Sequence, residues 1–355
     1  MRYLRAMLGL AISAACVIAL LTQIDPQRTW QSLSHARPGW LLATVGVLLL
    51  SMLVKAWRWG VLFYPTRGLR LQRLFSALAI GYLVLSVVPM RLGELVRAYL
   101  IGRTEPVAFT QAVGTILVEK ILDVLTILAF LALLGLFMPL PVLGVPNEVL
   151  VGLGLGGVGG LLILAWLPRQ RILALLARLQ LYLPGSRRFN LVRMIGPFLD
   201  AVAILRYPRV LPVVVLSSAL TWSLAALINY LGLQALAIEA PVAAAIWLMI
   251  VTNLVMILPS APGYVGVFHK FSVIALAAFA IDANEAAAYA IVLHALIYGT
   301  FIALGLIFVW RGGYRWRDLW PGTPPAAAPA SALVSPQTAG TDPVPAIVTL
   351  PEREP

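Results

Sequence analysis

Charged side chains, cysteine and histidine are all scarce in this sequence. Charged residues make up 11% of the 355 positions, whereas hydrophobic residues make up 61%. Soluble domains carry about 25% charged and about 45–50% apolar residues. The composition therefore excludes a water-soluble globular enzyme, and it excludes disorder over most of the chain.

The scarcity of cysteine and histidine limits metal and redox chemistry. The only cysteine, Cys16, lies in an apolar run, so the chain can form neither an internal disulfide nor a cysteine-based metal site. The three histidines, His35, His269 and His294, are too scattered for a metal motif by spacing alone. P-loop and Gly-x-Ser-x-Gly motifs are missing as well. We expect no metal, no cofactor and no enzymatic activity.

Acidic residues are fewer than basic ones. The chain has 14 Asp and Glu against 26 Lys and Arg, which gives a net charge of +12. In a soluble protein this excess would suggest nucleic acid. Most basic residues flank apolar runs instead, which is typical of membrane topology and of contact with anionic lipids. We therefore expect membrane lipids as partners, and no nucleic acid.

Long apolar runs dominate the rest of the sequence. A membrane-spanning helix needs about 20 apolar residues. Six runs reach this length: residues 4–24, 40–63, 107–138, 148–167, 210–237 and 284–310. Two more, residues 71–103 and 241–281, are interrupted in the middle by proline and glycine. The predicted fold is an all-α polytopic membrane protein with six full transmembrane helices and two broken helical hairpins.

The basic residues predict the orientation of these helices. They cluster at the N-terminus and in three segments: residues 2–5, 55–73, 168–209 and 311–317. The second cluster begins with Lys55 and Arg58. All four clusters can lie on the cytoplasmic side together, so both termini are predicted to be cytoplasmic.

One transmembrane domain, residues 1–312, accounts for most of the chain in this interpretation. The remaining residues, 313–355, are rich in proline and alanine without periodicity, which predicts a disordered cytoplasmic tail. The basic connector 168–209 is predicted to be cytoplasmic. Leucine and isoleucine recur at helical spacing in residues 170–183, which fits either a helix on the inner leaflet or a solvated helix pair.

The two interrupted runs have similar breaks. The breaks contain Pro89 and Gly93 in the first run, and Pro259, Pro262, Gly263 and Gly266 in the second. Proline stops or kinks a helix because it lacks the N–H group, and glycine permits the turn that follows. In each run a glycine follows the first proline by four residues, and the two breaks are 170 residues apart.

The arms of the first hairpin are too short to span a membrane. Residues 92–103 would reach about 18 Å as a helix, less than the hydrocarbon core of about 30 Å. The first hairpin is therefore predicted to be re-entrant. The arms of the second hairpin, residues 241–258 and 263–281, would nearly span, so this hairpin either spans or re-enters.

The flanking helices suggest an inverted repeat of residues 40–138 and 210–310. Residues 40–63 are predicted to run inward and residues 210–237 outward, so the two units have opposite polarity. Proline and glycine are common in membrane helices by chance, but the matched spacing and the opposite polarity favour a repeat. Inverted repeats with helices broken at mid-membrane are the architecture of secondary transporters.

Several charged residues lie near the first break. They are Arg91, Glu94 and Arg97 on one face of the short second arm, and Glu119, Lys120 and Asp123 in the next long run. Each charge at the membrane centre costs about 2.5–3.5 kcal/mol on insertion scales, so we expect these residues to pair. Arg91 and Arg97 are expected to pair with the two carboxylates of the long run. Glu94 is expected to pair with Lys120 or an arginine.

This group of charges has two interpretations. It forms a polar cavity in which Arg91 and Arg97 hold a phosphate group, because guanidinium forks match phosphate oxygens. The N-terminal end of the helix over 92–103 would add its dipole to that site. Alternatively, the group is an internal salt-bridge cluster that fixes the hairpin in place. Both interpretations can hold at once.

The second hairpin carries His269 and Lys270 after its glycines. His294 lies in the last long run, and Tyr298 follows four residues later on the same helix face. A histidine at this depth serves either in proton transfer or as a hydrogen-bonded packing residue. The candidate substrate-binding residues are Arg91, Glu94, Arg97, Glu119, Asp123, His269, Lys270 and His294.

Three ordered motifs carry a family resemblance. They read Arg91-Leu-Gly93-Glu94-Leu-Val-Arg97-Ala-Tyr99, Glu119-Lys120-x-x-Asp123 and Pro259-Ser-Ala-Pro262-Gly263-Tyr-Val-Gly266-Val-Phe268. In this order they resemble the lysylphosphatidylglycerol synthase transmembrane (flippase-like) family, over roughly residues 5–310. Many members have an acidic residue in place of His269, which weakens any mechanism carried over to the second hairpin. An arginine in place of Lys120 is usual and keeps the charge.

The resemblance implies a bacterial inner-membrane protein that moves lipids with polar heads between leaflets. In aminoacyl-phosphatidylglycerol synthases this region precedes a cytoplasmic aminoacyl transferase domain, which the sequence here lacks. We therefore expect a stand-alone member that acts as a flippase for an anionic phospholipid, a glycolipid or a lipid-linked intermediate. The alternative is a membrane-embedded subunit or enzyme of a lipid or cell-envelope pathway. It would present lipid to a separate cytoplasmic lipid-modifying transferase.

Overall fold

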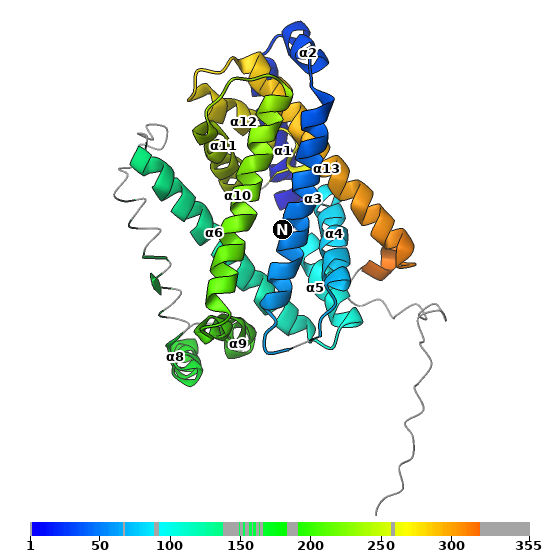
Figure 1. Cartoon of the computed structure of the whole chain (residues 1–355). Helices are drawn as coiled ribbons and strands as arrows, with labels where there is room; N and C mark the ends of the chain where they lie inside the picture. Colours follow the sequence, from blue (N-terminus) through cyan, green and yellow to red (C-terminus); the bar gives the residue numbers. More distant parts are fainter. Residues whose placement is uncertain are drawn as a thin grey trace, which may run out of the picture.

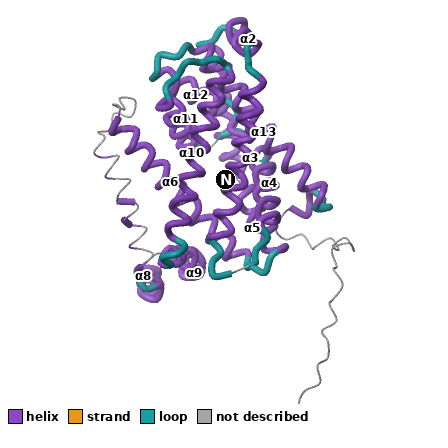
Figure 2. Tube along the Cα trace, viewed as in Figure 1, coloured by secondary structure: helices purple, strands orange, loops and turns teal. Residues whose placement is uncertain are grey.

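The computed structural model is helical wherever it has regular secondary structure (Figure 1). It describes residues 2–66, 68–88, 92–137, 166–182, 191–256 and 260–319, with isolated residues between 149 and 163. Within these residues there is no strand (Figure 2), so the all-α prediction is confirmed for this part of the chain.

The helices follow one another with short connections. They are α1 (Arg2–Leu21), α2 (Pro26–Ser34), α3 (Pro38–Val61), α4 (Leu71–Val87), α5 (Gly93–Thr104), α6 (Phe109–Phe137), α8 (Arg169–Tyr182), α9 (Leu191–Val202), η3 (Ala203–Arg206), α10 (Leu211–Ala235), α11 (Val242–Val255), η4 (Pro262–Tyr264), α12 (Val267–Ala277), α13 (Ala283–Arg311) and η5 (Trp316–Leu319).

Four of the described helices, α3, α6, α10 and α13, are long and apolar enough to cross a membrane. The last part of α1 and the whole of α2 form a bent pair with an angle of 89°, which would add a fifth span if counted as one. The bend has a local cause, because Asp25 caps α2 by accepting the N–H of Gln27 and Pro26 starts the new helix. The predicted span 148–167 lies largely outside the described residues, so the count of six full spans stays a prediction.

The helices around the two breaks are all short. The arms α4 and α5 have 17 and 12 residues, and α11 and α12 have 14 and 11. At about 1.5 Å per residue, even the longest arm falls short of a core of about 30 Å. The arms of the second hairpin are thus shorter than the sequence suggested, because α11 ends at Val255 and α12 begins only at Val267.

The two hairpins enter the bundle from opposite ends (Figure 1). The arms α4 and α5 pack together towards the end of the molecule that carries α8 and α9, whereas α11 and α12 pack together towards the end that carries α2. The segment η4 at the tip of the second hairpin packs against α4. This placement is what the predicted inverted arrangement requires, although the repeat itself stays a prediction.

Glycines at the breaks have two different roles. Gly263 and Gly266 have φ angles of 67° and 84°, the left-handed region that favours glycine, as expected for turn residues. Gly93 instead allows close packing, since a Cβ atom there would lie 2.1 Å from the carbonyl oxygen of Gly81. Pro262 opens η4, while Pro89 and Pro259 lie outside the described residues.

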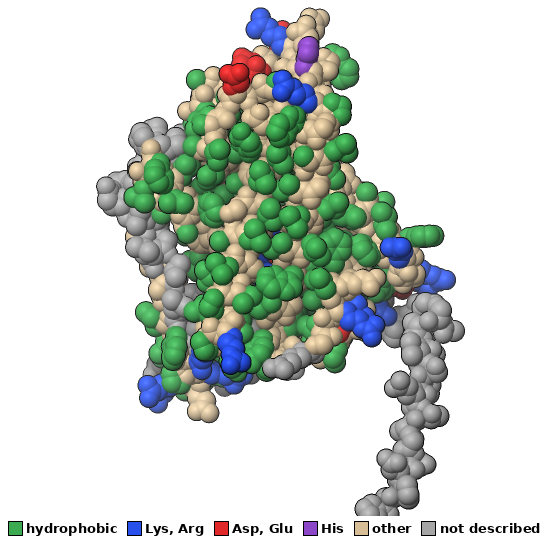
Figure 3. Space-filling model, viewed as in Figure 1, with side chains coloured by type: hydrophobic (Ala, Val, Ile, Leu, Met, Phe, Trp, Pro, Cys, Tyr) green, Lys and Arg blue, Asp and Glu red, His purple; other side chains and the backbone are tan. Residues whose placement is uncertain are grey.

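The distribution of side chains fits a membrane protein. Figure 3 shows hydrophobic side chains over the middle of the molecule and Lys and Arg towards its two ends. The helices α8 and α9 of the basic connector lie at one end, where Arg169 forms a 2.6 Å ion pair with Asp200. α9 packs on α6, so the connector is attached to the bundle.

The ordered chain extends beyond the boundary predicted for the tail. Leu319 of η5 is fully buried, and the backbone oxygen of Asp318 accepts a 3.4 Å hydrogen bond from Arg103 on α5. The first residues of the predicted tail, 313–319, are therefore packed against the domain. The prediction of disorder at these positions is wrong because the aromatic and apolar residues before the alanine-rich part can still be buried. Residues 320–355 lie outside the described residues.

Candidate functional site

Arg58 is the centre of a buried group of charges. Its side chain on α3 is fully buried, and one of its terminal nitrogens lies 2.7 Å from the carboxylate of Asp123 on α6. The same nitrogen lies 3.6 Å from Glu119, and the other donates a 3.0 Å hydrogen bond to the Ser218 hydroxyl on α10. The sequence analysis assigned Arg58 to the cytoplasmic basic cluster, and this is wrong. Arg58 faces the interior, which a count of charges near a helix end does not reveal.

Arg97 and Glu119 form the second part of this group. Both terminal nitrogens of Arg97 on α5 donate to the two carboxylate oxygens of Glu119, and both side chains are buried. The guanidinium of Arg97 also stacks on Trp59 at 3.8 Å from the ring centroid, and the Trp59 indole donates a 3.0 Å hydrogen bond to Thr115. The predicted pairing of Arg97 with a carboxylate of the long run is confirmed.

Asp123 has different partners from those predicted. Its carboxylate accepts from Arg58 at 2.7 Å and from the indole N–H of Trp222 at 3.2 Å. The predicted pairing of Asp123 with Arg91 or Arg97 is therefore not what the described residues form. Arg91 itself lies outside the described residues.

Glu94 and Lys120 form a less buried pair beside this group. The Lys120 ammonium lies 2.9 Å from the Glu94 carboxylate, and the two side chains are 47% and 32% exposed. The predicted pairing is confirmed. Its exposure sets it apart, because the other pairs are closed off from the surroundings.

We refer to Arg58, Arg97, Glu119, Asp123 and the Glu94–Lys120 pair as the charge cluster. Its three cations and three carboxylates balance. Pairing on this scale offsets the cost of burial, so the salt-bridge interpretation describes these residues well. The match is incomplete, since the Nε atoms of Arg58 and Arg97 are buried without a hydrogen-bond partner among the described residues.

The two histidines of the second half lie side by side. The ring centroids of His269 and His294 are 4.7 Å apart, and His294 stacks on Tyr298 at 4.3 Å. His294 Nε2 lies 2.7 Å from the backbone oxygen of Gly263 in the break, which fixes this imidazole to the hairpin tip. The prediction that Tyr298 shares a face with His294 is confirmed.

Lys270 lies apart from both groups. Its ammonium donates a 3.4 Å hydrogen bond to the backbone oxygen of Ala19 and a second one to Gln23, at the end of α1. The candidate residues therefore separate into the charge cluster, the histidine pair and a lysine that attaches α12 to α1.

Aromatic rings connect the charge cluster with the histidine pair. Tyr82 on α4 stacks on Phe301 with centroids 4.4 Å apart, and Phe301 lies 5.9 Å from Tyr298. Tyr298 in turn stacks on His294. Both groups therefore border one continuous packed region between the hairpin tips.

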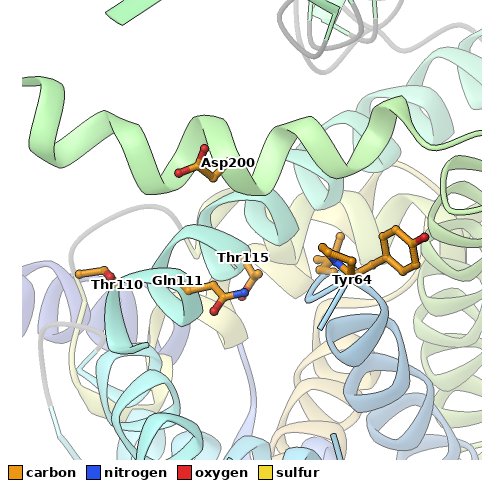
Figure 4. A pocket seen from close by; sticks show the side chains of 7 residues that line it. Tyr64, Thr110, Gln111, Thr115 and Asp200 are labelled. Atoms are coloured by element: carbon orange, nitrogen blue, oxygen red, sulfur yellow. The ribbon is translucent and has the colours of Figure 1, made fainter. Parts of the chain in front are cut away.

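A cavity of about 330 Å³ lies on one side of the charge cluster (Figure 4). The residues that line it are Leu62, Tyr64, Pro65, Thr110, Gln111, Thr115 and Asp200. Thr115 is shared with the cluster through its hydrogen bond to Trp59. The cavity thus approaches the buried arginines from the end of the bundle that carries α9. Within the described residues, no group of three or more His, Cys, Asp or Glu could hold a metal ion.

Sequence reasoning missed several members of the site. They are Lys55, Arg58, Trp59, Thr115, Ser218 and Trp222. One signal was available: Ser51, Lys55 and Arg58 recur at spacings of four and three within an apolar helix, which marks a polar stripe on one face. The aromatic and hydroxyl partners on other helices carry no such signal.

Comparison with known proteins agrees with this picture. The family model described as the lysylphosphatidylglycerol synthase TM region matches residues 6–305, which include the charge cluster, both hairpins and the histidine pair. Searches of curated proteins and of solved structures find no match. The match covers most of the sequence and agrees with the three motifs around residues 91–99, 119–123 and 259–268. The chain belongs to the lysylphosphatidylglycerol synthase TM region family.

Proposed function

We propose that this protein is a flippase that moves a lipid with an anionic head group across the bacterial inner membrane, with both termini in the cytoplasm. The observation that carries the proposal is the charge cluster, which lies inside a bundle of apolar helices. Charged residues at such depth are costly, and in membrane proteins they mark substrate or ion pathways. The family supports a membrane protein concerned with lipid handling.

The charge cluster suits a polar head group because it combines fixed and accessible charges. Arg58 and Arg97 are held by Asp123 and Glu119, which orients their guanidinium groups. The Glu94–Lys120 pair is partly exposed, so an incoming phosphate would compete with Glu94 for the ammonium. Arg91 precedes α5 in the sequence and stays a candidate phosphate ligand.

The hairpins would provide the path. A lipid head group must cross a core of about 30 Å, and broken helices place polar backbone groups at mid-depth only where protein or a cavity surrounds them. The tip of the second hairpin packs on α4 of the first, so both breaks border the same region. In the proposed mechanism the head group passes between the tips as the two repeat units rock against each other.

The energy source would be an ion gradient, mass action or a partner protein. His269 and His294 are our candidates for proton coupling, because His294 contacts the backbone of Gly263 in the break. A proton on this imidazole pair would change the contact that holds the hairpin tip.

Flipping by the purified protein tests the proposal. The full chain is reconstituted into phosphatidylcholine liposomes with a trace of fluorescently tail-labelled phosphatidylglycerol, and dithionite is added outside. We expect dithionite to bleach label from both leaflets in liposomes with protein, and only outer-leaflet label in empty liposomes. An unchanged leaflet distribution across several anionic lipids would contradict the transport function.

Two variants separate function from folding. Arg97→Ala should abolish flipping, but it also leaves Glu119 with one fewer partner and is expected to lower stability. Lys120→Gln changes the half-exposed pair and should keep the fold while slowing flipping. If folded Arg97→Ala and Lys120→Gln proteins both flip lipid at the wild-type rate, the charge cluster is only structural.

A further inference from the structure

Lys55 occupies an unusual position on α3. It lies about two turns before the helix ends at Val61, and its side chain is half-buried. The Nζ atom lies 5.8 Å from the centroid of the Trp222 ring on α10 and 6.0 Å from that of the Tyr82 ring on α4. Trp222 is near the middle of α10, so the ammonium lies deep in the bundle rather than at its end.

Lys55 is also the cation of this region that lacks a carboxylate. Arg58, Arg97 and Lys120 each form an ion pair, whereas Lys55 forms none with the described residues. The nearest indole, Trp222, already donates its N–H to Asp123, which Arg58 neutralises. The balanced charge cluster therefore has a net positive neighbour.

The aromatic rings do not satisfy this ammonium. An ammonium group has three hydrogen-bond donors, and a ring face accepts it only through a cation–π attraction of about 0.5–2 kcal/mol. At about 6 Å from both centroids, Lys55 is at the outer limit of that interaction. Its donors remain available for an acceptor that enters the space beside the two rings.

Extension towards water is the ordinary role of a lysine near the end of a transmembrane helix. The contacts of Lys55 argue against that role, because its ammonium lies over rings of two helices that pack on α3 inside the bundle. Lys270 shows the contrast, since its ammonium donates to Ala19 and to Gln23. Lys270 therefore provides a matched control.

The geometry points to Lys55 as the binding site for the phosphodiester of the lipid head group. This inference rests on the proposed function and names the group of the substrate that is recognised. The phosphate oxygens would accept from the free ammonium, and the partly apolar surroundings of Trp222 and Tyr82 would strengthen the attraction between the two charges. The three carboxylates of the charge cluster are already paired, so they repel the incoming anion less than free carboxylates would.

Lipid binding by native mass spectrometry tests the assignment directly. The detergent-solubilised full chain is titrated with phosphatidylglycerol and, separately, with a phosphate-free glucosyl diacylglycerol. For Lys55→Gln we expect the affinity for phosphatidylglycerol to fall about tenfold or more, because a charge-assisted hydrogen bond is lost. Lys55→Arg should retain most of it. Binding of the glucosyl lipid should change little in either variant.

Controls decide between this site and a general effect. Lys270→Gln should bind phosphatidylglycerol like the wild type, and thermal unfolding should show that all three variants are folded. The inference is overturned if Lys55→Gln binds phosphatidylglycerol normally, if Lys270→Gln loses as much affinity, or if free inorganic phosphate competes as well as the lipid does. Lys55-dependent binding without any flipping would leave the inference standing and contradict only the transport function.

Discussion

The guanidinium of Arg58 lies 2.7 Å from the carboxylate of Asp123, and the two residues belong to helices that are separated in sequence by the whole first hairpin. Because both side chains lie inside the bundle, this ion pair joins α3 to α6 around α4 and α5. Ser218 of α10 and Trp222 of the same helix add hydrogen bonds to its two ends. The pair thus fixes three long helices relative to one another.

Replacement of Arg58 by leucine should strongly destabilise the protein. The change leaves Asp123 buried without its cation and Glu119 with one cation fewer, and breaking a buried pair in this way costs about 3–5 kcal/mol. We expect a large fall in the midpoint of thermal unfolding in detergent. The exposed Arg70→Leu is the control and should change the midpoint little.

The double variant Arg58→Leu/Asp123→Leu tests the cause. It removes both charges, so it should be more stable than Arg58→Leu alone. A single Arg58→Leu protein as stable as Arg70→Leu would contradict the buried ion pair.

The Glu94–Lys120 pair should matter more for transport than for stability. Both side chains are partly exposed, and such pairs contribute about 1 kcal/mol or less. The charge-swapped double variant Glu94→Lys/Lys120→Glu keeps the pair with reversed order. We expect near-normal thermal unfolding for it, together with a flipping rate reduced about tenfold or more. Normal flipping by a folded charge-swapped protein would remove this pair from the pathway.

Gly93 should not tolerate a side chain. A Cβ atom at this position would lie 2.1 Å from the Gly81 carbonyl oxygen and 3.0 Å from the Leu85 nitrogen, so the two arms of the hairpin would have to separate. We expect Gly93→Ala to cost about 1–3 kcal/mol or more, measured by thermal unfolding. In the control Gly299→Ala, the new Cβ has no atom within 4 Å, and the substitution should be neutral or slightly stabilising. Equal effects of the two substitutions would contradict the close packing of α4 and α5.

Asp282 should stabilise the start of α13 in a pH-dependent way. Its carboxylate accepts the backbone N–H of Asn284 at 2.8 Å, and this hydrogen bond lowers the pKa of Asp282 below its ordinary value of 3.8. The stabilisation is therefore complete above that ordinary value and is lost as pH falls through the lowered pKa of the folded state. Asp282→Ala should cost about 1 kcal/mol at neutral pH.

The pH series identifies this cap. The difference in unfolding midpoint between wild type and Asp282→Ala should shrink on acidification, whereas Asp282→Asn should keep most of the cap at every pH. A difference that does not change with pH would mean that the carboxylate charge has no part in capping α13.

Local chemistry explains which features the sequence could predict. Pro and Gly marked both breaks, and charges at helical spacing predicted that Arg97 and Glu94 pair with residues of the next long helix. The spacing of His294 and Tyr298 likewise placed them on one face. Each of these predictions depends on residues that are close in sequence or on the cost of leaving a charge unpaired.

Other features depend on how helices are arranged in space. Arg58 looked like a topological charge because it lies near the cytoplasmic end of α3 as predicted, yet it faces α6 and α10. The partnership of Asp123 with Trp222, and the position of Lys55 between two rings, required the packing of helices far apart in sequence. The second hairpin seemed long enough to span, because hydrophobicity does not show where a helix ends before a break.

Transbilayer movement of phosphatidylglycerol by the reconstituted full chain tests the central claim most directly. We predict that dithionite bleaches both leaflets of liposomes that contain the wild-type protein, and that this activity is lost in folded Arg97→Ala protein at the same protein-to-lipid ratio. Bleaching restricted to the outer leaflet in wild-type liposomes, with phosphatidylglycerol and with other anionic lipids, would contradict the claim.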